Sequence, residues 1–251
     1  MDVSHSSNQS PQPDSTQLAQ DRLQQMAHFQ AGFLGTASHE LRAPINKIIS
    51  LHQLILEDLC ENPEEEREFV EQANQAIFQV LQNLDLLIQV SKFDIGAVNP
   101  KLQPVFVQGV LDQVQQLTNM KCLNRQCRLT VEPVAGDLLA DSDNHWLQQV
   151  LLLLVDGALV AGSAMISLAA QAVDDSAVTI LLTSDVALGC WQPSTGPERA
   201  VQPTIKSTDI SPGFRYQIAE RMVAHLNGTL TCRSTGEDGA EIVMALPAVS
   251  L

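Results

Sequence analysis

The chain has 251 residues, of which 45% are hydrophobic, so it can bury a core and form one or two domains. Its 29 acidic residues outnumber its 14 basic ones, which gives a formal net charge of -15. Nucleic acids and anionic membrane surfaces both attract basic proteins, because cations must neutralise their phosphates. We therefore expect neither nucleic acid nor a membrane as a partner.

Residues 1–14 are polar and rich in Ser, Gln and Pro, which indicates a disordered leader and not a secretory signal. The longest apolar run, residues 150–155, is far shorter than the roughly 20 residues that span a bilayer. The five cysteines include no Cys-x-x-Cys pair, and Cys122 and Cys127 have too few companions for a zinc site. The sequence thus predicts a cytoplasmic protein with reduced thiols and no metal site.

Residues 15–97 are predicted to form a hairpin of two long antiparallel helices. The first helix is capped by Asp14 and ends near Cys60, and the second begins with Asn62 as N-cap and Pro63 in its first turn. Apolar residues recur at alternating spacings of three and four, as in a coiled coil. They are Leu34, Leu41, Ile45, Ile48, Ile55 and Leu59, then Ala73, Ile77, Val80, Leu84 and Leu87. This pattern places His52 in the core and predicts that two hairpins pair as a homodimeric four-helix bundle.

Residues 101–248 show a different pattern, in which short β-like runs alternate with helical stretches. Strands are expected over 105–107, 128–131, 165–170, 178–183, 230–233 and 241–246, and helices over 109–120, 144–160 and 213–226. A loop rich in Pro, Gly and Ser over 189–212 is long enough to be a lid or its remnant. The pattern predicts an α+β sandwich with helices on one face of a mixed sheet.

The stretch 33–44, FLGTASHELRAP, contains the residues best suited to chemistry. His39 lies one position outside the predicted apolar line, so its imidazole should stand on the flank of the bundle. Small residues surround it, and Glu40 supplies a carboxylate that can hold the imidazole in one tautomer and assist proton transfer. Pro44 removes a backbone hydrogen bond and is expected to bend the helix just beyond.

This stretch resembles the H-box of two-component histidine kinases, whose pattern is Ser-His-Glu-Leu-Arg-Thr/Ala-Pro. The resemblance implies that His39 is the phosphorylated nucleophile and that Glu40 is its acid/base helper. At the position of Ala43 the family often has Thr or Asn, which is thought to orient water for dephosphorylating the partner. Alanine lacks that polar group, which puts phosphatase activity in doubt.

The resemblance continues into the ATP-binding domain of the family, but the polar motifs there are degenerate. The Asn-x-x-x-Asn motif has become Leu153 and Gly157, and the nearby Lys position is Val160. Mg²⁺ requires oxygen ligands, and neither leucine nor glycine has a side-chain oxygen.

Two further nucleotide motifs are also incomplete. The adenine motif Asp-x-Gly-x-Gly appears as DVALG over 185–189, and the glycine-rich phosphate loop appears as SPGFR over 211–215. The resemblance implies that Asp185, Gly189 and Gly213 are vestigial nucleotide-binding residues, although a purely structural role suits Asp185 and Gly213 at least as well. Phosphoryl transfer depends on positioning and charge neutralisation, so these losses together should disable it. We expect no cofactor, with ATP and Mg²⁺ possible only if the divergent site still works.

Three functional hypotheses follow. The first is a histidine phosphotransferase in which His39 exchanges a phosphoryl group with the receiver Asp of a response regulator, without autophosphorylation from ATP. The second is an ATP-dependent histidine kinase with a divergent site. The third is a non-catalytic pseudokinase scaffold that binds a receiver or pairs with an active sensor kinase. The sandwich is in each case a degenerate histidine-kinase ATPase-like domain.

Overall fold

The computed structural model describes residues 15–94, 99–134, 136–174, 176–192, 210–236 and 239–249. The expected leader over 1–14, with the predicted cap Asp14, lies outside these residues, as does most of the loop expected over 189–212. The chain forms two units, residues 1–35 and 36–251. Of the first unit, the structure describes the helical backbone from Ser15 onward. The second unit contains the hairpin from Thr36 onward and all the elements that follow it.

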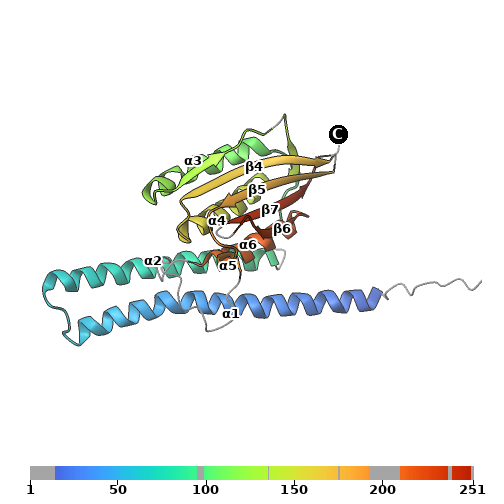
Figure 1. Ribbon diagram of the computed structural model, residues 1–251. Coiled ribbons are helices and arrows are strands. Elements are labelled where there is room, and N and C mark those ends of the chain that lie inside the picture. Colours follow the sequence, from blue (N-terminus) through green and yellow to red (C-terminus); the bar gives the residue numbers. More distant parts are fainter. Residues whose placement is uncertain are drawn as a thin grey trace, which may run out of the picture. The chain divides into compact units, whose positions relative to one another are not determined.

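Helix α1 (Ser15–Leu56) and helix α2 (Pro63–Asp94) form the predicted hairpin, and from Thr36 onward α1 runs antiparallel to α2 (Figure 1). The start of α2 is as predicted, because the Asn62 Oδ1 accepts a hydrogen bond from the Glu65 N–H at 2.8 Å. The predicted end of α1 is wrong, because the helix stops at Leu56 and not near Cys60. Asp58 adopts a left-handed φ of 53°, and the Leu59 N–H donates to the Leu54 carbonyl at 3.0 Å, which closes the helix.

The buried line of the hairpin differs from the predicted one. In the second unit it consists of Ala37, Pro44 and Leu51 on α1 and Ala73, Ala76, Asn83 and Val90 on α2. Leu41, Ile48 and Ile55 are only half-buried, and His52 is exposed, which corrects its expected place in the core. Several of these buried residues are alanines, and the larger apolar residues are left on the neighbouring face.

A stripe of exposed apolar residues therefore runs along the hairpin. It consists of Ile45, Ile49, Ile77, Leu81, Leu84 and Ile88, which are between 38% and 51% exposed. The α2 members recur at spacings of four, three and four, the repeat of a helix that packs against other helices. The stripe is the surface on which a second hairpin would pack.

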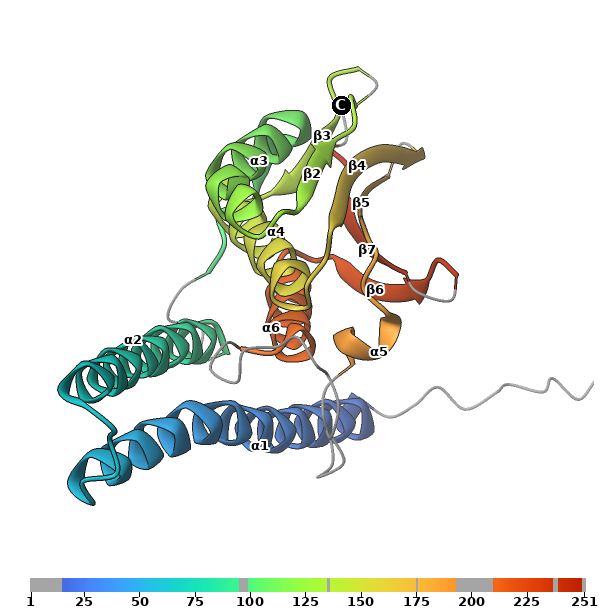
Figure 2. The ribbon, with the colours of Figure 1, turned by 60° about the vertical axis from the view of Figure 1, so that its left-hand side comes forward.

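The rest of the second unit is a sandwich of a mixed sheet and three longer helices (Figure 2). Its elements are β1 (Gln103–Phe106), α3 (Val107–Asn124), β2 (Arg128–Val131), β3 (Leu139–Ser142), α4 (Asn144–Val160), β4 (Met165–Asp174), β5 (Ala177–Ser184), α5 (Leu188–Trp191), α6 (Pro212–His225), β6 (Thr229–Ser234) and β7 (Ala240–Pro247). The five-stranded sheet has the order β2-β4-β5-β7-β6, with β2 and β4 parallel and the other neighbours antiparallel. Helices α3, α4 and α6 cover one face, as predicted.

The core of the sandwich lies between these helices and the sheet. The apolar run 150–155 belongs to α4, where Val150, Leu151, Leu154 and Val155 are almost fully buried. It therefore forms the interior of the domain, and none of the described helices is long and apolar enough to cross a membrane. Strands β1 and β3 pair in a separate two-stranded sheet, and β3 was not predicted from the sequence.

Candidate functional site

His39 lies on α1 with an exposed side chain, and its neighbours Ser38, Arg42 and Ala43 are also exposed. Pro44 is buried, and α1 continues through it to Leu56. An imidazole on an exposed helix face can be approached by another protein without rearrangement of the hairpin. The accessibility expected for His39 is therefore observed.

Glu40, the neighbour of His39, reaches across to the sandwich. Its Oε2 accepts a hydrogen bond from the Ser211 N–H at 2.9 Å, and its Oε1 accepts one from the Ser211 hydroxyl at 2.5 Å. Ser211 is the N-cap of α6, and its hydroxyl oxygen accepts from the Phe214 N–H at 3.3 Å. A helix N-terminus favours a negative charge, which suits a carboxylate at this point. The acid beside His39 thus binds the first residue of the vestigial phosphate loop.

This contact could not be predicted from the sequence, because the two residues are 171 positions apart. Adjacent residues on a helix also point in different directions, so proximity in sequence does not bring the Glu40 carboxylate to the imidazole. The acid/base role of Glu40 stays a prediction, and its observed partner is Ser211.

Gly157, which stands where the family has its metal-binding Asn, is packed against Trp191. A Cβ at Gly157 would lie 2.9 Å from Trp191 Cζ3 and 3.6 Å from Arg215 Cδ. Trp191 comes from the short helix α5 and is 1% exposed. Any side chain at residue 157 would collide with the indole, so Trp191 and Arg215 fill this position.

Arg215 is itself held by neighbouring groups. Its guanidinium lies 3.9 Å from the Asp156 carboxylate, and its Nε donates to the Ile210 carbonyl at 3.3 Å. The Lys121 ammonium shares the Asp156 carboxylate at 3.0 Å. The Arg215 cation is thus part of an ion-pair network with Asp156 and Lys121.

Asp185 has a defined structural role at the end of β5. Its carboxylate accepts hydrogen bonds from the Ser163 hydroxyl and from the N–H groups of Ala164 at 3.1 Å and Met165 at 3.3 Å. Burial alone would raise the pKa of this carboxyl group, but the hydrogen bonds outweigh it and lower the pKa. Asp185 therefore fixes the turn between α4 and β4.

The side chain of Asp185 also lines an open cavity of about 370 Å³, together with Thr130, Ser167 and Thr183 of the sheet. The other two predicted nucleotide residues show no special geometry. Gly189 is exposed, Gly213 is buried in the first turn of α6, and neither is among the described glycines with positive φ. Neither position therefore uses the backbone freedom that a phosphate-binding glycine needs.

The residues present do not fit Mg²⁺-ATP at the expected position. Leu153 and Gly157 have no side-chain oxygen for the ion, and the indole of Trp191 packs where the second Asn side chain would stand. Among the described residues, no group of three or more His, Cys, Asp or Glu side chains is arranged to hold a metal ion.

Comparisons with known proteins find similarity in both the hairpin and the sandwich. Residues 29–96 match the His Kinase A (phospho-acceptor) domain model. The chain is 24% identical over 242 residues to the autoinducer 2 sensor kinase/phosphatase LuxQ of Vibrio parahaemolyticus, a match that covers 92% of this chain and 28% of the relative. It is 26% identical over 257 residues to the sensor histidine kinase AtsR of Burkholderia thailandensis, covering 93% of this chain and 40% of the relative.

Solved structures show the same fold. The Acinetobacter baumannii histidine kinase AdeS aligns with a TM-score of 0.59 at 15% identity, over 83% of this chain and 97% of that one. Histidine kinase ThkA, solved in complex with the response regulator protein TrrA, aligns with a TM-score of 0.57 at 16% identity, over 92% and 64%. Full-length ShkA in complex with AMPPNP aligns with a TM-score of 0.53 at 20% identity, over 87% and 46%.

A helical hairpin that matches the His Kinase A domain, followed by a sandwich of this topology, is the arrangement found in these histidine kinases. The hairpin matches the His Kinase A domain, and the chain as a whole is similar to two-component histidine kinases. It spans well under half the length of the curated relatives described above.

Proposed function

We propose that the chain is a histidine phosphotransferase, in which His39 exchanges a phosphoryl group with the receiver Asp of a response regulator without autophosphorylation from ATP. The observation that carries this proposal is the contrast between the hairpin and the sandwich. The imidazole of His39 is exposed in an intact H-box, whereas Trp191 and Arg215 pack against Gly157 where a nucleotide-binding side chain would be expected.

The proposed reaction needs only the hairpin and the receiver. A nitrogen of His39 attacks the phosphorus of the receiver acyl phosphate, an N–P bond forms, and the O–P bond to the receiver carboxylate breaks. The carboxylate is the leaving group, and transfer onward to a second receiver is the reverse of this step. Because the receiver brings its own charge-neutralising groups, the sandwich has no part in the chemistry, and degeneracy of its motifs is tolerated.

The proposed acceptor acts in a homodimer. The exposed apolar stripe on α1 and α2 supports this, since water contact with a continuous line of Ile and Leu side chains is unfavourable and a second hairpin would remove it. The match to the His Kinase A domain points the same way. We further propose that the protein acts in the cytoplasm, as the acidic composition and the absence of a candidate membrane span among the described helices support.

An ATP-dependent kinase with a divergent site is the second candidate, because the relatives LuxQ and AtsR are both described as sensor kinases. This reading requires Trp191 to leave its buried position before a nucleotide could enter. The third candidate, a pseudokinase scaffold, requires that His39 carry no phosphoryl group at all. It would bind a receiver, or a partner sensor kinase, through the same surfaces.

The three candidates are separated by offering the purified chain two phosphoryl donors in separate reactions. One is labelled ATP with Mg²⁺, and the other is a panel of prephosphorylated receiver domains. The proposal predicts label on the chain from receivers only, with His39→Gln as the unlabelled control. Label from ATP alone would select the kinase, and no label from either donor, with receiver binding retained, would select the scaffold.

A further inference from the structure

Cys122 and Cys127 lie side by side at the end of α3. Gln126 adopts a left-handed φ of 56° just after the helix, and the Cys127 N–H then donates to the Cys122 carbonyl at 2.9 Å. This turn brings the two side chains together, and their thiols hydrogen-bond to each other. Cys122 is 3% exposed and Cys127 is 6% exposed.

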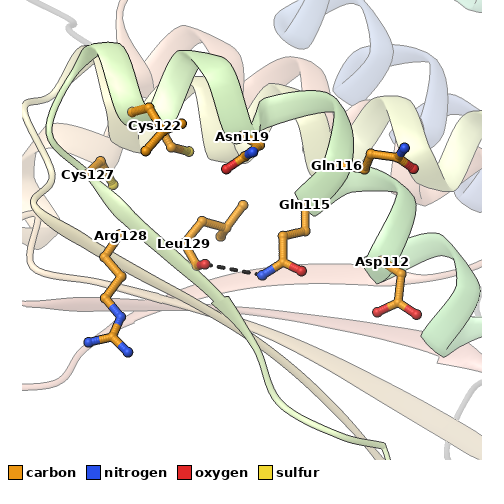
Figure 3. Close-up of a pocket in the computed structure, with 9 residues that line it drawn as sticks. Asp112, Gln115, Gln116, Asn119, Cys122, Cys127, Arg128 and Leu129 are labelled. Carbon is orange, nitrogen blue, oxygen red and sulfur yellow. Dashed lines mark hydrogen bonds between the residues drawn. The ribbon is translucent and has the colours of Figure 1, made fainter.

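An open pocket gives small molecules a route to this pair. The pocket has a volume of about 470 Å³ and lies between α3 and β2, and both cysteines line the same end of it (Figure 3). Asp112, Gln116 and Asn119 provide polar side chains on the α3 wall. The Gln115 side chain donates to the Leu129 carbonyl at 3.2 Å and thereby holds the helix to the strand across the pocket.

The pair is also connected to the Asp185 turn. The Cys127 thiol also lies beside Ser163, whose hydroxyl donates to the Asp185 carboxylate. A chain of contacts therefore runs from Cys122 through Cys127 and Ser163 to Asp185. A change at the thiols would alter a partner of the residue that fixes the α4–β4 turn.

We propose that Cys122 and Cys127 form a redox-active dithiol, which a small disulfide oxidant entering the pocket converts to an intrachain disulfide. Formation of the bond draws the Cys127 sulfur away from Ser163 and loosens the α4–β4 turn. The remaining cysteines, Cys60, Cys190 and Cys232, take no part in the reaction.

The reaction proceeds in two exchange steps. The thiolate of Cys122 attacks one sulfur of the oxidant and releases one thiol, and the thiolate of Cys127 then attacks the Cys122 sulfur and releases the second. The two cysteines lose two protons and two electrons, and the oxidant is reduced to two thiols.

The surroundings determine which thiol reacts first. Burial raises the pKa of both thiols, that of Cys127 to about 11, while hydrogen bonds from Thr118 and Cys127 and the charge of Lys121 partly offset this effect at Cys122. Asp156 raises the pKa of Cys122 and Asp185 raises that of Cys127. Cys122 is thus the better nucleophile, and the reaction is slow at neutral pH and faster at alkaline pH.

The test treats the full native chain with glutathione disulfide and follows free thiols, intact mass and disulfide-linked peptides. The proposal predicts that two of the five thiols are lost, that the mass falls by two hydrogen atoms, and that the linked peptides contain Cys122 and Cys127. Hydrogen exchange of the Ala164 and Met165 amides should rise several-fold, and dithiothreitol should reverse both changes. Cys232→Ser should still lose two thiols, whereas Cys127→Ser should form no intrachain disulfide.

Two results would overturn the proposal. The first is glutathione adducts without an intrachain bond, or a bond that involves another cysteine. The second is unchanged exchange of both amides after the bond has formed, which would remove the connection to Asp185. The peptide mapping uses the native chain, so it stays informative even if Cys127→Ser unfolds, and His39→Gln should give the same thiol loss.

Discussion

Gly157 has no room for a side chain, because the indole of Trp191 packs against it. A Cβ there would stand 2.9 Å from Trp191 Cζ3, a distance that requires the ring to move. We expect Gly157→Ala to lower the free energy of unfolding by about 1–3 kcal/mol, the usual cost of overpacking. Chemical denaturation followed by circular dichroism measures this loss.

The matched controls test the cause of that loss. Gly189→Ala places the same methyl group where no described heavy atom lies within 4 Å, and it should change the stability by less than about 1 kcal/mol. Trp191→Leu should relieve the collision, so that Gly157→Ala costs much less in that background. Additive effects of Gly157→Ala and Trp191→Leu would show that the indole does not occupy this position.

Glu40 and Ser211 should be energetically coupled, because both Glu40 oxygens accept hydrogen bonds from Ser211. A double-mutant cycle over Glu40→Gln and Ser211→Ala should give a coupling energy of roughly 1–2 kcal/mol in the free energy of unfolding. Ser211→Ala also removes the N-cap of α6, so part of its effect should persist without Glu40. Additivity within about 0.5 kcal/mol would mean that the bond from the Ser211 hydroxyl to Glu40 contributes nothing in solution, since Ser211→Ala keeps the bond from the Ser211 N–H.

Asp185 should make stability depend on acid pH. Its pKa is lowered in the folded protein, so its contribution is present above the unfolded-state pKa and is lost as the pH falls towards the folded-state pKa. Asp185→Asn should therefore be less stable than the native chain at neutral pH, and the difference should shrink below about pH 4. Thermal melts at a series of pH values measure this, and a constant difference at every pH would contradict it.

At the scale of single elements, we expect the apolar stripe of the hairpin to hold the proposed dimer together. Ile77→Glu would place two carboxylates in a buried helix interface, which should weaken the dimer by about 3 kcal/mol, or roughly a hundredfold. Sedimentation analysis over a range of concentrations measures the dissociation constant. Gln75→Glu makes the same acidic replacement at an exposed polar position of α2 and should leave association unchanged. A wild-type chain that stays monomeric at high concentration would refute the homodimer.

The elements that the sequence predicts best are those with strong local signals. Helix α2 begins where Asn62 and Pro63 predict, and α4 spans the predicted residues after its cap Asp143, whose carboxylate accepts from His145 and Trp146 N–H groups. Strand β3 escaped prediction because it has only four residues, two of them polar, and depends on pairing with β1. The predicted buried face of α1 was wrong by one position, because the burial of Ala37 and Leu51 depends on tertiary packing that periodicity alone cannot place.

For the whole molecule, the sequence predicts a candidate phospho-acceptor, His39, but not its surroundings. The exposed position of His39 follows from a local motif, whereas the Glu40–Ser211 contact and the packing of Trp191 on Gly157 join distant segments. The motif losses at Leu153 and Gly157 were visible in the sequence, but the residue that fills the space was not. That residue is Trp191, whose indole packs against Gly157.

The most direct measurement is to map the phosphorylated side chain after the chain is incubated with a prephosphorylated receiver and no ATP. The account predicts an acid-labile, alkali-stable phosphoryl group on the peptide that contains His39, and none on His39→Gln. A phosphoryl group on any other residue, or one that appears only when Mg²⁺-ATP is supplied, would contradict it.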